Sequence, residues 1–438
     1  MTLGILKKDI LQIDSKNAQL FNTNMFEIKT YYHEILKKVY SDIQKINNKY
    51  HTSKKINYYD IFNILIQKSA FNYTYDQIID IIYQTYNINI SSKTIRQKIK
   101  KINIVNVTNI FNNILKMFYE ICPKKGRILS CDGTTTKTHI SLKKEGFCET
   151  NTDSYCNLHI STIFDSTNKI PITYIINKNN NERDDVKKLL KYVEENDIIL
   201  FDRGYVSFDL MKMLNSNKIQ FVIRARENMD IISDLEKSKL CEKIYDENDV
   251  LSNGFKIRII KYTLKKSNNE DSKYYLFTNI FNMDYNEFSD LYFKRWSIEV
   301  FFNKFKNNVF GDFIDVRSSD ELYKFIDLKF TIILITRLII EISIKIFGKI
   351  TNDQKIINFT SAQRIVVTCI LNNMIYDNDN YNAFFCHIMK IYNNQIFSIK
   401  NRSFLHYPTK ENYKNNDKEK LKIRTKENIK SNELHKSS

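Results

Sequence analysis

Proline and glycine are scarce in this chain of 438 residues, which contains 3 Pro and 8 Gly. Such low counts exclude a collagen-like protein and a long linker rich in proline and glycine. The 7 cysteines are odd in number, scattered and without a C-x-x-C pair, so the sequence indicates neither a disulfide framework nor a zinc knuckle. The 7 histidines show no H-x-x-x-H spacing, and we interpret them as structural. A reducing compartment is therefore the simplest expectation.

Long uncharged hydrophobic runs are also missing. The most apolar stretch, 325–347, is interrupted by five charged residues: Asp327, Lys329, Arg337, Glu341 and Lys345. Several charges at membrane depth would be too costly, so this stretch predicts a buried amphipathic helix. The N-terminal residues carry charges where a signal peptide needs an apolar core. We therefore expect a soluble protein without a membrane partner, in the cytoplasm or, if the host is eukaryotic, in the nucleus.

Acidic residues are outnumbered: 50 Asp and Glu stand against 67 Lys and Arg, which gives a net charge of +17. A basic chain often binds nucleic acid. However, Asn, Lys, Ile and Tyr are abundant throughout, as an AT-rich genome would produce, so part of this charge has a compositional origin. The charge alone is a weak indication of a nucleic-acid partner. The hydrophobic fraction of 42 % excludes a wholly disordered chain.

Hydrophobic periodicity divides the chain into five regions. Apolar residues recur at helical spacing up to about residue 122, whereas short alternating or apolar runs predict strands beyond it. The predicted regions are an N-terminal helical region (1–55), a second helical region (56–125), an α/β domain (126–347) with a β-rich insertion (227–282), a C-terminal helical region (348–400) and a disordered polar tail (401–438).

The α/β domain should contain a mixed sheet with flanking helices. Between 127 and 226 the predicted order is strand, strand, strand, helix, strand, helix, strand, which is typical of such a sheet. Its first and fourth strands are predicted over 127–132 and 197–202. Two long helices, over about 285–309 and 319–347, should follow the insertion.

The segment 75–102 predicts two helices joined by a short turn, the second opened by Ser91 or Ser92 as N-cap. The isoleucines of the second helix would face inward, and its outward face would carry Lys93, Thr94, Arg96, Gln97 and Lys100. This pattern is typical of a helix-turn-helix whose second helix enters a major groove, where Arg and Gln read base edges. The alternative is an ordinary helical hairpin with a basic solvent face.

Three carboxylates occupy conspicuous positions. Asp132 and Asp202 each end a predicted strand, and Glu299 lies in the first long helix after the insertion. Strand ends in such a sheet open onto a crevice where loops can hold a ligand. Carboxylates are the oxygen donors that Mg²⁺ requires, and carboxylates from separate elements can hold two ions for phosphoryl displacement. Taken singly, the aspartates are more often turn or helix caps, and the glutamate more often belongs to a solvated helix face.

A polar stripe surrounds Glu299 on its predicted helix. It consists of Tyr292, Arg295, Glu299 and Lys306, whose spacing of 3, 4 and 7 residues places them within an arc of roughly 60° at about 100° per residue. The other faces carry Phe293, Ile298, Val300, Phe301 and Phe305, so we expect the helix to be largely buried. Since an unpaired buried charge is costly, the stripe must meet polar partners. An ion pair between Arg295 and Glu299 explains only half of it.

The pattern Y-x₂-R-x₃-E-x₆-K resembles the motif of one group of DDE transposases from bacterial insertion sequences, the insertion-sequence-four type, which is related to the Tn-five type. The F-D-R-G-Y around Asp202 and the C-D-G-T around Asp132 resemble the acidic motifs of that family, in the expected order. The resemblance covers roughly residues 125–345. Three motifs in order within the matching strand pattern form a fairly specific signal.

The resemblance implies a metal-dependent transposase with an RNase H-like catalytic domain. Such an enzyme cleaves transposon-end DNA and joins the freed end to target DNA. By the same resemblance, two Mg²⁺ (or Mn²⁺) ions are bound by the catalytic residues Asp132, Asp202 and Glu299. The residues implied to hold phosphates of the transposon end are Tyr292, Arg295 and Lys306.

A homodimer that holds two transposon ends in a synaptic complex is also implied. In some relatives a tryptophan of the insertion stacks on a flipped base during hairpin formation, but the only tryptophan here is Trp296, in the predicted helix. A hairpin intermediate is therefore not indicated. Two other functions stay open: a DNA-binding descendant of a transposase that no longer cleaves, and an RNase H-like nuclease without strand transfer. The metal-ion hypothesis predicts that the three carboxyl carbons lie within roughly 5–8 Å.

Overall fold

The computed structural model describes residues 56, 58–122, 126–147, 154–178, 182–238, 240–246, 256–265, 271–306, 313–348, 355–371 and 381–397. The predicted regions 1–55 and 401–438 lie outside these residues. Two compact units are distinguished, 1–262 with 275–398 and 263–274 with 399–438. The described part of the second unit consists of the ends of two strands.

In the described part of the chain, four helices precede the sheet: α3 (Tyr58–Phe71), α4 (Tyr75–Tyr86), α5 (Ser92–Lys101) and α6 (Ile104–Ile121). Local capping fixes their ends. Thr74 and Gln77 form a capping box at the start of α4, and Asn87 ends that helix in the left-handed conformation. Ser91 Oγ accepts a hydrogen bond from the amide of Thr94 and so opens α5. α4 and α5 are the two helices predicted within 75–102.

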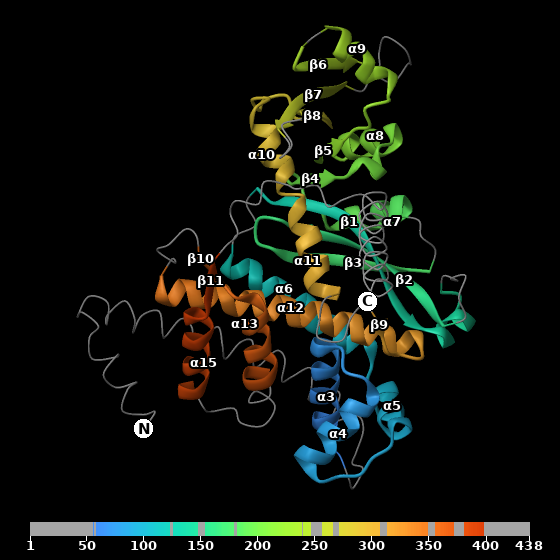
Figure 1. The fold of residues 1–438 in the computed structure, drawn as a ribbon, viewed down its shortest axis with the longest axis vertical. Coiled ribbons are helices and arrows are strands. Elements are labelled where there is room, and N and C mark those ends of the chain that lie inside the picture. Colours follow the sequence, from blue (N-terminus) through green and yellow to red (C-terminus); the bar gives the residue numbers. More distant parts are fainter. Residues whose placement is uncertain are drawn as a thin grey trace, which may run out of the picture. The chain divides into compact units, whose positions relative to one another are not determined.

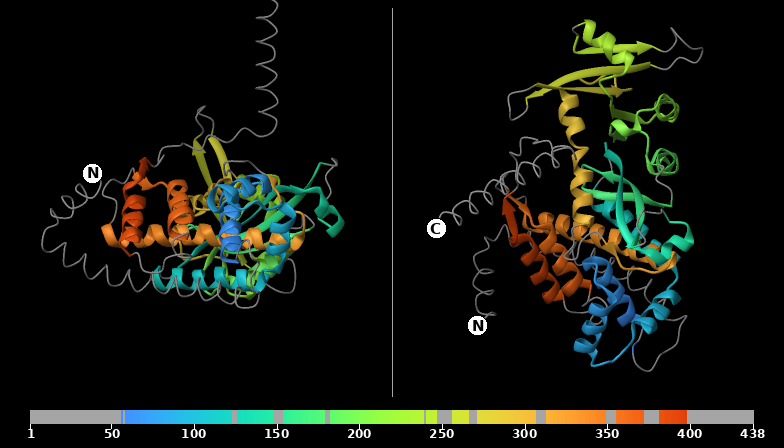
Figure 2. Two further views of the ribbon diagram at one scale, coloured as in Figure 1. Left: turned by 90° about the horizontal axis from the view of Figure 1, so that it is seen from below. Right: turned by 45° about the vertical axis from the view of Figure 1, so that its right-hand side comes forward.

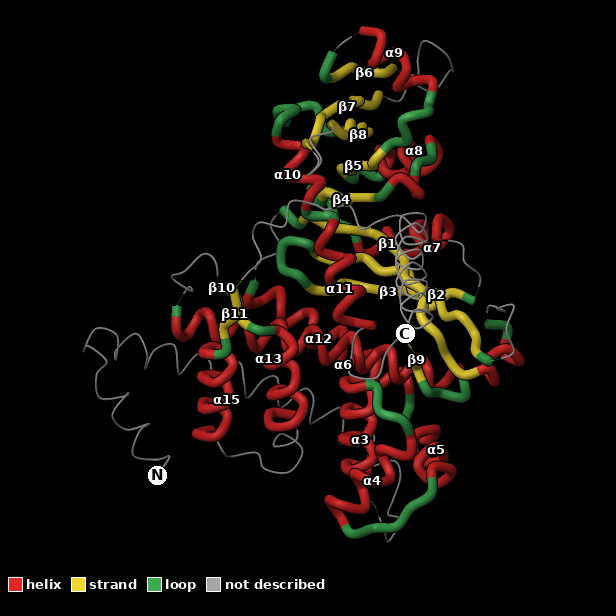
Figure 3. Tube along the Cα trace, in the orientation of Figure 1, coloured by secondary structure: helices red, strands yellow, loops and turns green. Residues whose placement is uncertain are grey.

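A nine-stranded mixed sheet forms the centre of the fold, in the order β3-β2-β1-β4-β5-β8-β7-β6, with β9 paired to β1 (Figures 1 and 3). Its strands are β1 (Ile128–His139), β2 (Tyr155–Asp165), β3 (Ile170–Asn177), β4 (Ile198–Phe201), β5 (Gln220–Arg224), β6 (Glu242–Asp246), β7 (Lys256–Lys265), β8 (Asp271–Thr278) and β9 (Phe313–Ile314). The first three strands are antiparallel, and β4 and β5 run parallel to β1. This strand order is that of an RNase H-like core, which confirms the predicted α/β class.

Helices and short 3₁₀ turns connect the strands. They are the turn η1 (Ile140–Glu145), α7 (Glu182–Leu189), the turns η2 (Leu190–Tyr192) and η3 (Arg203–Tyr205), α8 (Phe208–Ser216), α9 (Asp230–Ser238), α10 (Glu287–Phe293), α11 (Trp296–Lys306) and α12 (Ser319–Phe347). The C-terminal region contains α13 (Phe359–Ile365), a π-helix (Val366–Leu371), α15 (Tyr381–Asn393) and a ribbon of β10 (Lys355–Ile357) with β11 (Gln395–Phe397). Besides these helices, the predicted C-terminal helical region includes a small antiparallel ribbon.

α12 packs against α6 and α3, and the three helices share one hydrophobic core with one face of the sheet (Figure 2). Its bounds match the predicted helix 319–347, with Ser318 as the N-cap. Its charged residues have partners: Arg337, for example, donates to the carbonyl oxygen of Asn168 at 3.0 Å. Within the described residues, no helix is both long enough and apolar enough to cross a membrane.

One strand prediction needs correction. β1 does not end at Asp132 but continues to His139, because it pairs with β2 along its whole length, as far as His139 with Tyr155. β-branched threonines after Gly133 favour this extended pairing. The predicted insertion at 227–282 is rich in β structure, as expected, and is part of the central sheet. Its strands β6, β7 and β8 extend the central sheet beyond β5, and it also contains the helix α9.

Asp327 connects α12 to α6 and β3 through two hydroxyl groups. Its Oδ2 accepts a hydrogen bond from Thr108 Oγ1 at 2.5 Å, and its Oδ1 accepts one from the hydroxyl of Tyr174. Burial raises the pKa of Asp327 to about 6, and the hydrogen bond from Thr108 opposes that shift. The native protein therefore holds the proton of Asp327 more tightly than the unfolded chain does.

We expect the Asp327→Asn variant to become more stable relative to the wild type as the pH rises. The stabilising contribution of protonated Asp327 is complete below the unfolded pKa of about 4 and is lost as the pH rises through about 6. Asparagine does not titrate. The free energy of unfolding of the variant, relative to that of the wild type, should therefore rise by on the order of 2 kcal/mol between pH 4 and pH 7.5. Urea unfolding at both pH values measures this difference. A difference that is independent of pH would contradict the assignment, and the exposed Asp184→Asn serves as the control.

Candidate active site

Three neighbouring parallel strands place charged residues in a row. Cys131 of β1 is in register with Phe201 of β4, which is in register with Ile223 of β5. Adjacent strands lie about 4.8 Å apart, so the next residues on these strands are neighbours as well. These next residues are Asp132, Asp202 and Arg224. The two aspartates predicted from the sequence are therefore brought together, although only Asp202 follows the last residue of its strand.

The two faces of the sheet decide where these aspartates point. Cys131 and Phe201 are buried in the core with residues of α7 and α8, whereas Leu200 is buried with Tyr292 of α10. Because successive side chains of a strand point to opposite faces, Asp132 and Asp202 lie on the face covered by α10 and α11. Figure 1 shows these two helices following one another across this part of the sheet.

Arg295 links two of the predicted carboxylates. It lies in the turn between α10 and α11, and its Nη1 is 3.6 Å from Asp132 Oδ2. Its Nη2 forms an ion pair with Glu299, one helical turn further along. The guanidinium group therefore stands between the carboxylates of β1 and α11 and neutralises part of their charge.

Tyr292 and Lys306 border the same cluster. Burial raises the pKa of Tyr292 to about 12; Arg295 and Arg224 oppose this shift, and the charge of Asp202 adds to it. Burial lowers the pKa of His159 of β2, and the positive charge of Lys306 lowers it further. Three residues of the predicted stripe, Tyr292, Arg295 and Lys306, thus lie near charged or titratable groups of the sheet, whereas Glu299 pairs with Arg295.

The helix that carries the stripe differs from its prediction in two ways. Instead of one helix over 285–309, α10 and α11 are separated at Lys294 and Arg295, where the amide of Arg295 donates to the carbonyl of Tyr292 three residues back, at 3.0 Å. The positions beyond 306 lie outside the described residues. The helix is also less buried than expected: Phe293 and Val300 are 53 % and 42 % exposed, because the sheet covers only one side of it.

The electrostatics of the cluster are dominated by Asp132. Burial raises its pKa to about 7. Arg295 and the amide of Gly133 oppose this shift, whereas the neighbouring carboxylates of Asp202 and Glu182 add to it. The Gly133 amide donates to Asp132 Oδ1 at 2.8 Å, and the Gly204 amide donates to Asp202 Oδ1 at 2.5 Å. The cluster therefore favours the arrival of further positive charge.

The three carboxylates do not by themselves form a finished metal site. In the part of the chain that the structure describes, no group of three acidic, histidine or cysteine side chains is arranged to hold a metal ion. Asp132 and Asp202 are neighbours, but Glu299 is paired with Arg295. In this structure the guanidinium group of Arg295 lies between Asp132 and Glu299, and the convergence of all three carboxylates around shared ions stays a prediction.

Arg224 and Glu182 are charged groups of this cluster that the sequence analysis did not select. Arg224 ends β5 in the same register position in which Asp202 follows β4. That position is the signal that could have identified it, since the strand 220–224 was predicted. Glu182 opens α7, and its sequence context offers no comparable signal.

The candidate helix-turn-helix residues divide into two groups. Lys93, Gln97 and Lys100 are exposed on α5, as predicted. Thr94 is half-buried, and its Oγ1 lies 3.0 Å from Ser91 Oγ. Arg96 does not face outward, and this corrects its predicted orientation. Its guanidinium stacks on the ring of Tyr75 at 3.6 Å and lies 3.4 Å from Glu321 of α12, because these two groups offer it a buried partner and a π face.

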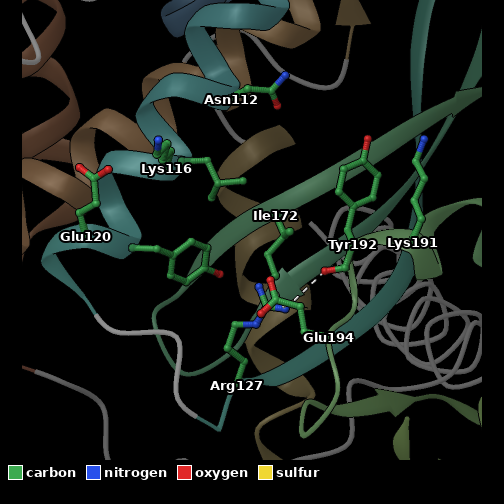
Figure 4. A pocket seen from close by; sticks show the side chains of 10 residues that line it. Asn112, Lys116, Glu120, Arg127, Ile172, Lys191, Tyr192 and Glu194 are labelled. Carbon is green, nitrogen blue, oxygen red and sulfur yellow. Dashed lines mark hydrogen bonds and ion pairs between the residues drawn. The ribbon is translucent and has the colours of Figure 1, made fainter. Parts of the chain in front are cut away.

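A pocket of about 490 Å³ lies elsewhere, between α6, the start of β1 and the turn η2 (Figure 4). Leu115 and Ile172 contribute apolar surface to it, and the side chains of Lys116 and Arg127 are among its charged lining. The guanidinium of Arg127 already pairs with Asp197. None of the three predicted catalytic carboxylates lines this pocket.

Comparison with known proteins bears directly on the carboxylate cluster. Residues 123–335 match the family described as Transposase DDE domain. The match begins before β1 and ends within α12, so Asp132, Asp202 and Glu299 all lie inside it. This part of the chain is therefore similar to the transposase DDE domain, in agreement with the coarser part of the predicted resemblance. Among solved structures, a cryo-EM synaptic complex of piggyBac transposase with hairpin DNA is similar, with 14 % sequence identity, coverage of 82 % of each chain and a TM-score of 0.45. The comparison with curated proteins gives no match.

Proposed function

We propose that this chain is a DDE transposase of the insertion-sequence-four type, which cleaves transposon-end DNA and transfers the freed end into target DNA. The observation that carries the proposal is the position of Asp132 and Asp202 on neighbouring parallel strands, within a segment that matches the transposase DDE domain. Arg295 connects Asp132 to Glu299, the third acidic residue of the motif.

Asp132, Asp202 and Glu299 would hold two Mg²⁺ or Mn²⁺ ions. Their oxygen donors suit these ions, and burial beside other carboxylates raises the pKa of Asp132 to about 7, so a nearby cation would stabilise its charged form. When bound, such ions activate water or a 3′-hydroxyl and stabilise the leaving oxygen of a phosphodiester. Glu299 would become available as a ligand once Arg295 turns from the carboxylates to a DNA phosphate, for which its guanidinium is equally suited.

Tyr292, Arg295 and Lys306 would hold phosphates of the transposon end beside these carboxylates. Arg224 adds a further positive charge next to Asp202. On α5, the exposed Lys93, Gln97 and Lys100 would contact DNA, with Thr94 at the start of the helix, whereas Arg96 is committed to Tyr75 and Glu321. We also propose a homodimer that holds two transposon ends, since synapsis requires both ends to be bound together.

Lys306→Gln should weaken DNA binding mainly through the salt-dependent term. Loss of one phosphate contact should reduce the slope of log K against log salt concentration by about 0.9 for duplex DNA. Fluorescence anisotropy with a labelled duplex between 50 and 200 mM salt is the suitable measurement. The control is Lys187→Gln, on α7, where the side chain is 63 % exposed and pairs with a neighbouring surface aspartate. Equal slopes for the wild type and both variants would argue against a phosphate contact at Lys306.

The proposed function is tested with duplex DNA taken from the two ends of the genetic element that encodes the chain. The purified protein should cleave these ends only in the presence of Mg²⁺ or Mn²⁺, and should join pre-cleaved ends to a target plasmid. Cleavage without joining would identify a nuclease. Binding without cleavage would identify a DNA-binding descendant of a transposase.

A further inference from the structure

Gly133 lies against the side chains of two residues from other elements. A Cβ atom on residue 133 would come within 2.5 Å of Glu182 Oε1 and within 2.6 Å of the His159 ring. Such separations are too short for real contacts, so a side chain at this position would have to displace the Glu182 carboxylate and the buried His159 ring. Glu182 Oε1 also lies 3.4 Å from His159 Nε2. The pair therefore confines the Gly133 backbone, whose amide holds the carboxylate of Asp132.

The next residue of the same helical turn confines the second aspartate. Arg183 donates two hydrogen bonds to the carbonyl oxygen of Gly204, from Nε at 3.2 Å and from Nη2 at 3.0 Å. The amide of Gly204 in turn donates to Asp202 Oδ1. Each aspartate thus accepts a hydrogen bond from a glycine amide, and each glycine is held by a side chain from the first turn of α7.

A buried hydrogen-bond network keeps this turn in place. Asp185 is fully buried; its Oδ2 accepts from Ser161 Oγ at 2.8 Å, and its Oδ1 accepts from Asn177 Nδ2 at 2.9 Å. Ser161 Oγ lies 3.3 Å from His159 Nε2. α7 is therefore fixed to β2 and β3, alongside β1 (Figure 1), and its first turn cannot shift without breaking these contacts.

We propose that the first turn of α7 is a positioning element of the active site, in which Glu182 with His159 sets Asp132 through Gly133, and Arg183 sets Asp202 through Gly204. The proposal rests on the proposed function in one respect, which is that the two aspartates bind metal ions. The distance between the two carboxylates then depends on one rigid turn that carries neither of them. Glu182, Arg183 and His159 are positioning residues, because they act through the two glycines.

Hydrogen–deuterium exchange of the metal-free protein tests this arrangement segment by segment. Glu182→Ala should accelerate amide exchange in the peptide around Gly133 by up to about tenfold, because the hydrogen bond from the Gly133 amide to Asp132 loses the packing that orients it, and leave the peptide around Gly204 unchanged. Arg183→Ala should do the reverse. Asp184→Ala, on the same turn but 57 % exposed, should change neither peptide. General destabilisation would affect both peptides together, so this crossed pattern separates positioning from a merely structural role.

Mn²⁺ titration by calorimetry supplies the second readout. Glu182→Ala and Arg183→Ala should each weaken Mn²⁺ binding about tenfold, the lower range for residues that orient metal ligands, whereas Asp184→Ala should bind as the wild type does. The positioning proposal would be overturned if Glu182→Ala and Arg183→Ala both showed the same amide exchange and Mn²⁺ affinity as Asp184→Ala. If the crossed exchange pattern holds but Asp132→Asn does not weaken Mn²⁺ binding, the positioning proposal stands and the metal site of the proposed function fails.

Discussion

Replacing Asp202 with asparagine should lower the rate of metal-dependent cleavage of transposon-end DNA about a thousandfold and leave DNA binding intact. A metal-binding carboxylate contributes several kcal/mol to the stabilisation of charge in the transition state, and each 1.4 kcal/mol is about a tenfold change in rate. Asparagine keeps an oxygen that can accept the Gly204 amide, so the turn after β4 should remain folded. Single-turnover cleavage at saturating protein, with binding measured separately by anisotropy, gives both quantities.

Asp209→Asn is the matched control for this experiment. Asp209 lies seven positions further along, exposed on the first turn of α8, and removing its charge changes the net charge of the protein by the same amount. Cleavage by this variant should equal that of the wild type. Full activity of Asp202→Asn would exclude Asp202 as a metal ligand and remove the main support for the catalytic proposal.

A second large effect is expected at the opposite ends of the same two strands. Arg127 and Asp197 directly precede β1 and β4, and both are 3 % exposed. Arg127 Nε donates to Asp197 Oδ1 at 2.9 Å, and a second ion-pair contact joins Arg127 Nη2 to Asp197 Oδ2. Asp197→Ala would leave the guanidinium buried without its main partner, so the free energy of unfolding should fall by about 3–5 kcal/mol. Urea unfolding monitored by circular dichroism measures this loss.

Two comparisons identify the cause of that loss. The double variant Arg127→Met/Asp197→Leu removes both charges and should recover most of the stability, since apolar residues of similar size avoid the cost of burying ions. Asp184→Ala breaks an ion pair whose side chains are both more than half exposed, and should change stability by no more than about 1 kcal/mol. A double variant as unstable as Asp197→Ala would show that packing, rather than an unpaired charge, is responsible.

Much of the fold could be predicted where the local pattern and the tertiary structure agree. The strands β2 and β3 show clear apolar runs around a turn, and α8 and α12 begin at the serines that cap them, Ser207 and Ser318. The length of β1 could not be predicted, because Gly133 is a local turn signal and only pairing with β2 overrides it. The break between α10 and α11 could not be predicted either, because no proline or glycine lies there.

The candidate site shows the same division between local and long-range information. The spacing of Tyr292, Arg295, Glu299 and Lys306 was enough to predict that one side of a helix meets polar groups. It could not indicate that Arg295 would pair with both Asp132 and Glu299, since the first contact depends on how the helix crosses β1. Arg96 was expected on a solvent face, but its partner Glu321 lies 225 positions away in sequence.

The attachment of the insertion to β5 has a consequence for any attempt to shorten the protein. β8 pairs with β5 from Val222 to Arg224, and β5 supplies Phe221 and Ile223 to the core behind the two aspartates. Excising 227–282 would turn an interior strand into a bare, apolar edge that other chains can join. A minimal version of the domain therefore has to keep β8, or replace it with a strand that covers the same edge.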